Sequence, residues 1–170
     1  MTDVDPTRID ISFDPREQRM VGVAYHGNTP FDVPFITEIH PGLWQGGCET
    51  GLILPGHIKH IVSLYPWEKY TINHQMKSEM YVRMYDSVDS GPGLDQIRSI
   101  AEWVNHLVEA KDGDVLVHCQ AGLNRSSFVV ATALILKGMS PDDAIGLLRA
   151  QRSPAVLCNP AFEAALRHEG

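Results

Sequence analysis

The residue types with the clearest potential for chemistry are a cysteine and an arginine six positions apart. Cys119 follows the β-strand-like run Val115–Val117, and Arg125 opens a segment with helical character. His118 precedes the cysteine and Ser126 follows the arginine. A cysteine and an arginine at this spacing occur often by chance, but the added histidine, serine and intervening glycine make a chance match rare. The segment therefore predicts a cysteine nucleophile on a loop between a strand and a helix.

The spacing is typical of a site for a tetrahedral oxyanion. A tight loop that leads into a helix N-terminus turns several backbone N–H groups inward, and the helix dipole adds partial positive charge. Gly122 permits the positive φ that such a loop usually needs. Arg125 offers a planar fork to two oxygens of the anion. The same positive field favours the thiolate form of Cys119, so this residue is expected to attack phosphorus.

This segment, His-Cys-Gln-Ala-Gly-Leu-Asn-Arg-Ser at 118–126, resembles the signature loop of cysteine-dependent protein tyrosine phosphatases, most closely of the dual-specificity branch. The resemblance covers roughly Ile36 to Leu166. The stretch from Ile39 to Gly47 is similar to the opening strand and turn of dual-specificity domains, and the stretch from His57 to Leu64 is similar to the next segment. Near the C-terminus, the chain resembles the C-terminal helices of the family at Arg152-Ser-Pro, Asn159 and Phe162.

The resemblance implies a role for each residue of the loop. Cys119 would form a phosphocysteine, Arg125 would clamp the phosphate, and Ser126 would assist breakdown of the intermediate. His118 would tune the thiolate from behind the loop. The phosphate would be bound by the backbone N–H groups of Gln120, Ala121, Gly122, Leu123, Asn124 and Arg125.

Such an enzyme also needs a general acid for its leaving group, and that group then acts as the base for the hydrolytic water. In the family it is an aspartate about thirty residues before the cysteine, just after the strand that precedes the long helix. Asp86 lies 33 residues before Cys119 and directly follows the strand-like run Tyr81–Tyr85. Asp89 lies 30 residues before it and fits the loop length slightly better. Asp86 is favoured, and both aspartates stay open as candidates.

Short β-rich runs alternate with helical patterns from Phe35 onward, which predicts an α/β fold with a central, mixed, mainly parallel sheet flanked by helices. The signature loop would lie between a strand and a helix N-terminus. We expect residues 1–35 to form a loosely structured lead-in segment with one short strand near Met20–Tyr25. We expect residues 36–170 to form a single dual-specificity-phosphatase-like catalytic domain. The expected strands are 36–39, 43–45, 60–65, 81–85 and 115–117, and the expected helices are 97–108, 125–136, one from 141 and one from 160.

Composition narrows the class of protein. The chain has 170 residues and a net charge of −7, which argues against nucleic acid or an anionic membrane as its main partner. Its three cysteines exclude a disulfide framework and favour a reducing compartment. The N-terminus is acidic, and the longest apolar stretch, Phe128–Leu136, is far shorter than the roughly 20 residues of a membrane helix. We therefore expect a cytoplasmic protein, most simply a monomer.

The loop between Cys119 and Arg125 contains no Lys, Arg or His. Each further phosphate of a substrate would need a cationic partner, so we expect a singly phosphorylated group on a protein or a small phosphomonoester, although Arg83 or Lys69 could add charge from the flanks. The eight histidines lack metal-ligand spacing, and neither a metal nor a cofactor is expected. The alternatives are a catalytically silent module that binds phosphorylated residues, and a sulfurtransferase or arsenate reductase.

Overall fold

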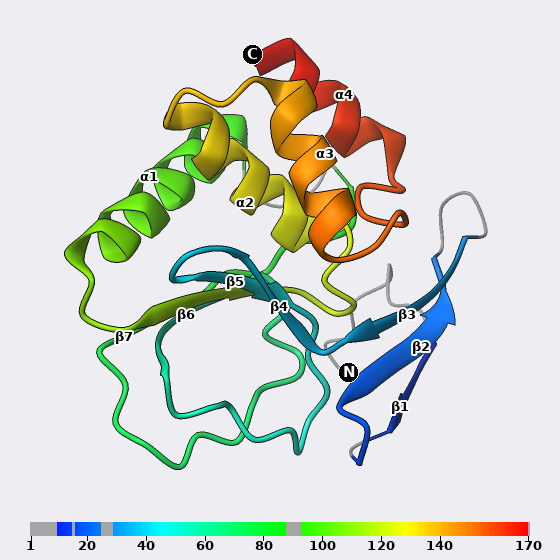
Figure 1. The fold of residues 1–170 in the computed structure, drawn as a ribbon, viewed down its shortest axis with the longest axis vertical. Helices are drawn as coiled ribbons and strands as arrows, with labels where there is room; N and C mark the ends of the chain where they lie inside the picture. The colour runs from blue at the N-terminus through cyan, green and yellow to red at the C-terminus, as the bar shows by residue number, and fades with distance from the viewer. Residues whose placement is uncertain (1–9, 15, 25–28, 88–92, 170) are drawn as a thin grey trace.

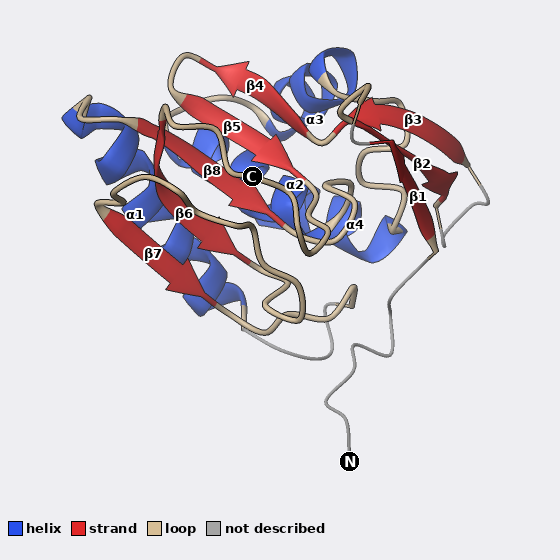
Figure 2. Cartoon of the chain, turned by 90° about the horizontal axis from the view of Figure 1, so that it is seen from below, coloured by secondary structure: helices blue, strands red, loops and turns tan. Residues whose placement is uncertain are grey.

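The computed structural model describes residues 10–14, 16–24, 29–87 and 93–169. A five-stranded sheet runs through the centre of this part of the chain (Figures 1 and 2). Across the sheet, the strands follow in the order β4 (Ile36–His40), β5 (Leu43–Gly46), β8 (Asp114–His118), β6 (Ile58–Ser63) and β7 (Ser78–Tyr81).

The central sheet is mixed but mainly parallel, as predicted. Only β4 and β5 pair antiparallel, through a turn in which Gly42 has a φ of 82°, a value that glycine adopts at no steric cost. β5, β8, β6 and β7 are parallel neighbours. In this register Gly46 and Ser63 lie on either side of His118. The carboxyl ends of three strands therefore meet at the residue before Cys119.

The four helices of the described ranges lie on one side of the central sheet (Figure 1). They are α1 (Leu94–Ala110), α2 (Arg125–Leu136), α3 (Pro141–Gln151) and α4 (Pro160–Glu169). α2 packs against the other three helices and against β5 and β8, so its residues are buried nearly all round, as expected for a central helix. The expected helices are confirmed, including the Ser140 hydroxyl cap that accepts from the Asp143 N–H at 3.1 Å. No helix in the described ranges is long and apolar enough to span a bilayer.

The strand predicted at Tyr81–Tyr85 was wrong. The strand is instead Ser78–Tyr81, and the N–H of Val82 makes the next hydrogen bond to the Ser63 carbonyl at 2.8 Å. Beyond it the chain leaves the sheet, and the carbonyl of Met84 accepts from Arg125 rather than from β6. The apolar residues continue past the strand because Met84 is buried and Val82 packs against the hydrophobic core.

The strand expected near Met20–Tyr25 is confirmed as β2 (Arg19–Val23), but the expectation that the other described residues before 35 are loosely structured was wrong. The described residues form an antiparallel sheet of β1 (Ile11–Asp14), β2 and β3 (Pro30–Pro34) (Figure 2). Each strand is only four or five residues long, so its sequence signal is weak. Met20, Phe31 and Val33 are buried, and this burial, rather than strand propensity, explains the sheet.

The N-terminal sheet reaches the signature loop through Gly47, the residue after β5. A Cβ added at Gly47 would lie 2.5 Å from the Gln120 carbonyl oxygen and 2.7 Å from the Met20 sulfur. The Cys48 N–H donates to the same Gln120 carbonyl at 3.0 Å. Gly47 therefore permits a three-way contact between the N-terminal sheet, β5 and the signature loop.

We predict that Gly47→Ala lowers the free energy of unfolding by about 1–3 kcal/mol, because the new methyl group must displace backbone. It should also reduce activity, since the displaced atom belongs to the signature loop. Gly56→Ala is the matched control, because no atom lies within 4 Å of its added Cβ, and its effect should stay within about 0.5 kcal/mol. Urea denaturation measures the free energy of unfolding of both variants. Equal stability of the two variants would contradict the contact.

Candidate active site

Cys119 lies at the carboxyl end of β8, six residues before the start of α2. Its backbone N–H donates to the Gly46 carbonyl at 3.1 Å, which extends the parallel pairing of β5 and β8 by one residue. The side chain is 2% exposed, and its Sγ lies 3.4 Å from the Oγ of Ser126. A sulfur nucleophile and a hydroxyl are thus brought together at the helix N-terminus.

Arg125 is the first residue of α2 and is 3% exposed. Its Nη1 donates to the Met84 carbonyl at 2.7 Å, and its guanidinium carbon lies 5.1 Å from the centre of the Tyr65 ring. The carbonyl contact and the ring hold the planar cation in one orientation. The predicted trio of Cys119, Arg125 and Ser126 therefore lies on one loop and the first turn of one helix.

The backbone carbonyls of the signature loop are all bonded to the surrounding fold, from Cys119 to Asn124. A carbonyl oxygen can only accept, and four of the six carbonyls accept from residues that are distant in the sequence, namely Cys48, Arg152 and Leu157. The pairs of carbonyl and donor are Cys119 with His118 Nδ1 (3.1 Å), Gln120 with Cys48 N (3.0 Å), Ala121 with Arg152 Nη2 (2.9 Å), Gly122 with Arg152 Nε (2.8 Å), Leu123 with Leu157 N (2.7 Å), and Asn124 with Phe128 N (2.9 Å).

Arg152, at the end of α3, is the main support of this loop. Besides Ala121 and Gly122, its guanidinium reaches the Pro34 carbonyl at 2.9 Å and the Thr37 hydroxyl at 2.8 Å. Burial lowers the pKa of Arg152 to about 10, so the group remains a cation at neutral pH. Its bonds to neutral oxygens stabilise a buried charge that would otherwise be costly.

Gly122 has a φ of 73°, as the loop chemistry predicted. A Cβ at this position would lie 2.5 Å from the carbonyl carbon of Gly46 and 2.7 Å from Arg152 Nη2. Both the conformation and the close approach of the neighbouring strand therefore require glycine here.

His118 is fully buried, and its ring meets that of Tyr70 edge-on with centroids 5.3 Å apart. Because the Cys119 carbonyl is an acceptor, Nδ1 carries the proton in this contact. The Nε2 atom has no hydrogen-bond partner among the described residues. Burial lowers the pKa of His118 to about 4, so its ring is neutral at pH 7. Any influence on Cys119 comes from a neutral hydrogen bond to the backbone and not from an imidazolium charge.

Asp86 lies beside the signature loop, held by two carboxamides. Its Oδ2 accepts from Asn124 Nδ2 at 3.1 Å, and its Oδ1 accepts from Asn159 Nδ2 at 3.1 Å. The backbone carbonyl of Asp86 accepts from the same Asn159 nitrogen at 2.9 Å. Asp86 is therefore fixed next to the residue that precedes Arg125. The other candidate, Asp89, lies outside the described residues.

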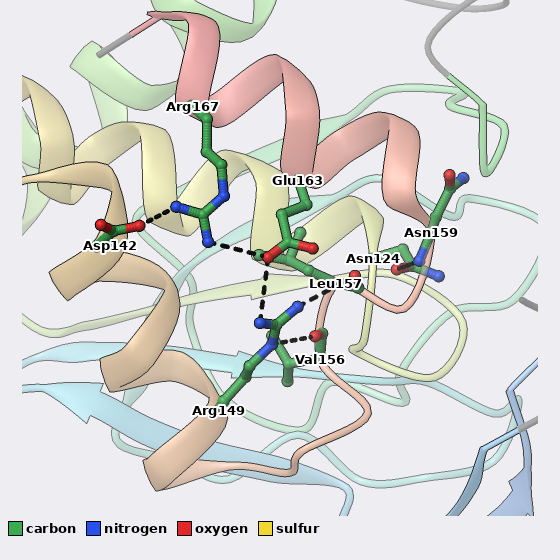
Figure 3. A network of polar contacts seen from close by, with 8 residues as sticks. All are labelled: Asn124, Asp142, Arg149, Val156, Leu157, Asn159, Glu163 and Arg167. Atoms are coloured by element: carbon green, nitrogen blue, oxygen red, sulfur yellow. Dashed lines mark hydrogen bonds and ion pairs between the residues drawn. The ribbon is translucent and has the colours of Figure 1, made fainter. Parts of the chain in front are cut away.

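The connection between α3 and α4 positions Asn159 (Figure 3). Arg149 donates to the carbonyls of Val156 at 2.9 Å and Leu157 at 3.4 Å and forms an ion pair with Glu163 at 3.2 Å. The Asn159 N–H then donates to Asn124 Oδ1 at 2.9 Å. The C-terminal helices thus fix a loop that contacts the signature loop through the Leu157 N–H, the Cys158 sulfur and the Asn159 N–H.

Comparison with known proteins agrees with this geometry. The family model described as "Dual specificity phosphatase, catalytic domain" matches residues 55–169. The chain belongs to the dual-specificity phosphatase family. The protein tyrosine phosphatase PRL-1 of Trypanosoma cruzi is 32% identical over 105 residues, which cover 59% of this chain and 58% of that protein. The RNA/RNP complex-1-interacting phosphatase of Bos taurus is 31% identical over 145 residues, covering 78% of this chain and 43% of that protein. The chain therefore spans about half the length of these relatives.

Solved structures share the fold. A mouse putative dual specificity phosphatase, crystallised with zinc tungstate, superposes with a TM-score of 0.67 at 23% identity and covers 79% of this chain and 86% of its own. The human tyrosine phosphatase-like serine/threonine/tyrosine-interacting protein superposes with a TM-score of 0.63 at 23% identity, covering 79% and 94%. At this identity the likeness supports the architecture and not a particular substrate.

Within this family domain, sequence reasoning gave no role to three residues that contact the signature loop: Arg152, Asn159 and Gln45. The first two lay in segments that resembled the family, but nothing in their spacing indicated which carbonyl or carboxylate they bind. Gln45 is the polar residue of a short strand, and its full burial was the missing signal, since a buried amide requires partners.

The neutral state of His118 predicts a dependence of stability on pH. As the pH falls through 6.5 the unfolded chain binds a proton on this ring, while the folded protein does not until about pH 4, so acid favours unfolding. Between pH 7.5 and 5, the free energy of unfolding should fall by about 2 kcal/mol more in the wild type than in His118→Asn. Urea denaturation at several pH values measures this difference, and parallel profiles would contradict it.

Proposed function

We propose that this protein is a phosphomonoester hydrolase of the protein tyrosine and dual-specificity phosphatase class. The observation that carries the proposal is the position of the Cys119 sulfur, 3.4 Å from the Ser126 hydroxyl at the end of β8 and beside the N-terminus of α2. The buried Arg125 cation opens that helix. Sulfur, hydroxyl and guanidinium at a helix N-terminus make a site for a phosphate dianion and a nucleophile that attacks it.

In the first step, the Cys119 thiolate attacks phosphorus and a P–S bond forms. The bond between phosphorus and the leaving oxygen breaks, and its electron pair stays on that oxygen, which takes a proton from an aspartic acid. Arg125 and the backbone N–H groups of residues 120–125 bind the phosphoryl oxygens. Support for this orientation comes from the loop carbonyls, all of which are bonded to the surrounding fold, leaving the opposite face of the peptide units for the anion.

In the second step, water attacks the phosphorus of the phosphocysteine. The P–S bond breaks, its electron pair returns to Cys119, and the aspartate takes a proton from the water. Ser126 assists by hydrogen bonding to the departing sulfur. His118 takes part only through the backbone of Cys119, as a positioning residue.

Asp86 remains the favoured acid and Asp89 the alternative. The contact with Asn124 places the Asp86 carboxylate beside the signature loop, one residue from the phosphate clamp. The acid must donate a proton to the leaving oxygen in the first step and take one from water in the second.

The remaining aspects of function follow from the same chemistry. We propose a phosphorylated protein or small phosphomonoester as substrate, because the signature loop between Cys119 and Arg125 carries no further cation. A reducing compartment such as the cytoplasm would keep the three cysteines free, as they are in this structure. We further propose a monomer without nucleic acid or membrane partners, with residues 36–170 as the catalytic domain.

Hydrolysis of p-nitrophenyl phosphate in the presence of EDTA tests the proposal. Wild type should turn over without added metal, and Cys119→Ser should lose activity by on the order of 10⁴-fold or more, because the nucleophile is removed. Gly56→Ala, whose added Cβ has no atom within 4 Å, is the control and should stay within about 3-fold of wild type. If folded wild type shows no turnover but binds phosphopeptides in competition with phosphate, the silent binding module replaces the enzyme.

The acid is assigned by comparing Asp86→Asn with Asp89→Asn on two substrates. On a phosphoserine peptide, whose leaving alkoxide needs a proton, Asp86→Asn should slow turnover by about 10²–10⁴-fold. On p-nitrophenyl phosphate, which has a good leaving group, the loss should be much smaller. Asp89→Asn should have a minor effect on both substrates. The reverse order of the two variants on the peptide would assign the role to Asp89.

A further inference from the structure

Gln45 lies in β5 directly beneath the signature loop and is fully buried. Its side-chain nitrogen Nε2 lies 2.9 Å from the Gly122 carbonyl oxygen and 3.3 Å from the Ser126 Oγ. It also lies within hydrogen-bonding distance of the Ser127 hydroxyl. One amide group therefore contacts both the loop that surrounds the phosphate site and the hydroxyl beside the nucleophile.

The chemistry of these partners fixes the orientation of the amide. The Gly122 carbonyl can only accept, so the nitrogen of Gln45 and not its oxygen must face the loop. The oxygen Oε1 then points away and is buried without a hydrogen-bond partner among the described residues. An unpartnered buried oxygen destabilises the fold, and an apolar side chain in β5 would avoid that cost. The amide is therefore better explained by what its nitrogen donates to than by packing.

The amide in turn restricts the Ser126 hydroxyl. The two hydrogens of Gln45 Nε2 face three acceptors, and the Ser126 Oγ at 3.3 Å is the most distant of them, so it shares a hydrogen with the Ser127 hydroxyl. Because this hydrogen points at the Ser126 Oγ, the hydrogen of the Ser126 hydroxyl must point elsewhere. The sulfur of Cys119 lies 3.4 Å from the same oxygen. A thiolate has no hydrogen, so in that state the hydrogen bond between the two residues can only run from the Ser126 hydroxyl to the sulfur.

We propose that Gln45 is a positioning residue that aims the Ser126 hydroxyl at the Cys119 sulfur while the phosphocysteine is hydrolysed. This inference rests on the proposed phosphatase activity. When the P–S bond breaks, the electron pair goes to sulfur, and the Ser126 hydroxyl stabilises the new thiolate by donating a hydrogen bond. Gln45 touches neither the substrate nor the reacting atoms. It acts through the Ser126 hydroxyl: Gln45 donates a hydrogen bond to the hydroxyl oxygen, so the hydroxyl hydrogen stays available for the sulfur.

The test is pre-steady-state release of p-nitrophenol by Gln45→Met, Ser126→Ala and the double variant. Methionine keeps the length of the side chain without a donor, and the Gly122 carbonyl keeps its bond to Arg152. Gln45→Met should slow phosphocysteine breakdown by about 10-fold and leave its formation within about 3-fold. A burst approaching one p-nitrophenol per enzyme should therefore appear in Gln45→Met and in Ser126→Ala. Ser127→Ala removes the other hydroxyl that Gln45 contacts and should show the wild-type time course.

The double variant separates positioning from general support of the fold. If Gln45 acts through Ser126, the double variant should break down its phosphocysteine no more slowly than Ser126→Ala alone. Additive losses, or no burst in Gln45→Met, would overturn the inference. A Ser126→Ala variant without a burst would overturn it too, because there would then be no assistance to position. Circular dichroism verifies folding, and Gln45→Leu replaces Gln45→Met if the latter does not fold. Absence of wild-type turnover would overturn the proposed phosphatase activity itself.

Discussion

The structure around the site depends on one constraint: a loop that presents its N–H groups to an anion must bond its carbonyls elsewhere. Six successive carbonyls, from Cys119 to Asn124, accept hydrogen bonds from donors around the loop. A buried carbonyl without a donor costs stability, and a loop free to rotate its peptide units would lose the anion site. The fold supplies these donors at fixed positions, and that requirement connects segments far apart in the sequence.

The donors explain why the parts of the chain that are remote from Cys119 matter to it. Arg152 ends α3 and binds two loop carbonyls while also reaching β3 at Pro34. Leu157 belongs to the connection between α3 and α4, which Arg149 fixes (Figure 3). Cys48 follows β5, where Gly47 gives the N-terminal sheet access to the same loop. The helices and the small sheet therefore stabilise the loop as well as the core.

The sequence predicted those features that are encoded locally. The Cys119 loop, Gly122 with its positive φ, the helix from Arg125 and the Ser140 cap each follow from neighbouring residues. Contacts between distant residues left no local pattern. The burial that orders the three short N-terminal strands comes from tertiary packing, and the contact of Asp86 with Asn159 depends on a loop more than seventy residues away.

Arg152 also shapes the electrostatics of the site. Its four acceptors in the described part of the chain are three carbonyls and one hydroxyl, all neutral. Dipoles stabilise the cation without cancelling its charge, whereas a carboxylate partner would remove most of its field at a distance. Burial lowers the pKa of Arg152 to about 10, while the charge of Cys119 acts on it in the opposite direction. A cation behind the loop favours the binding of an anion in front of it. Replacing Arg152 with lysine would keep the positive charge but not the planar fork that bonds two adjacent carbonyls. The electrostatic potential at the site would therefore be retained, while the conformation of the loop would not.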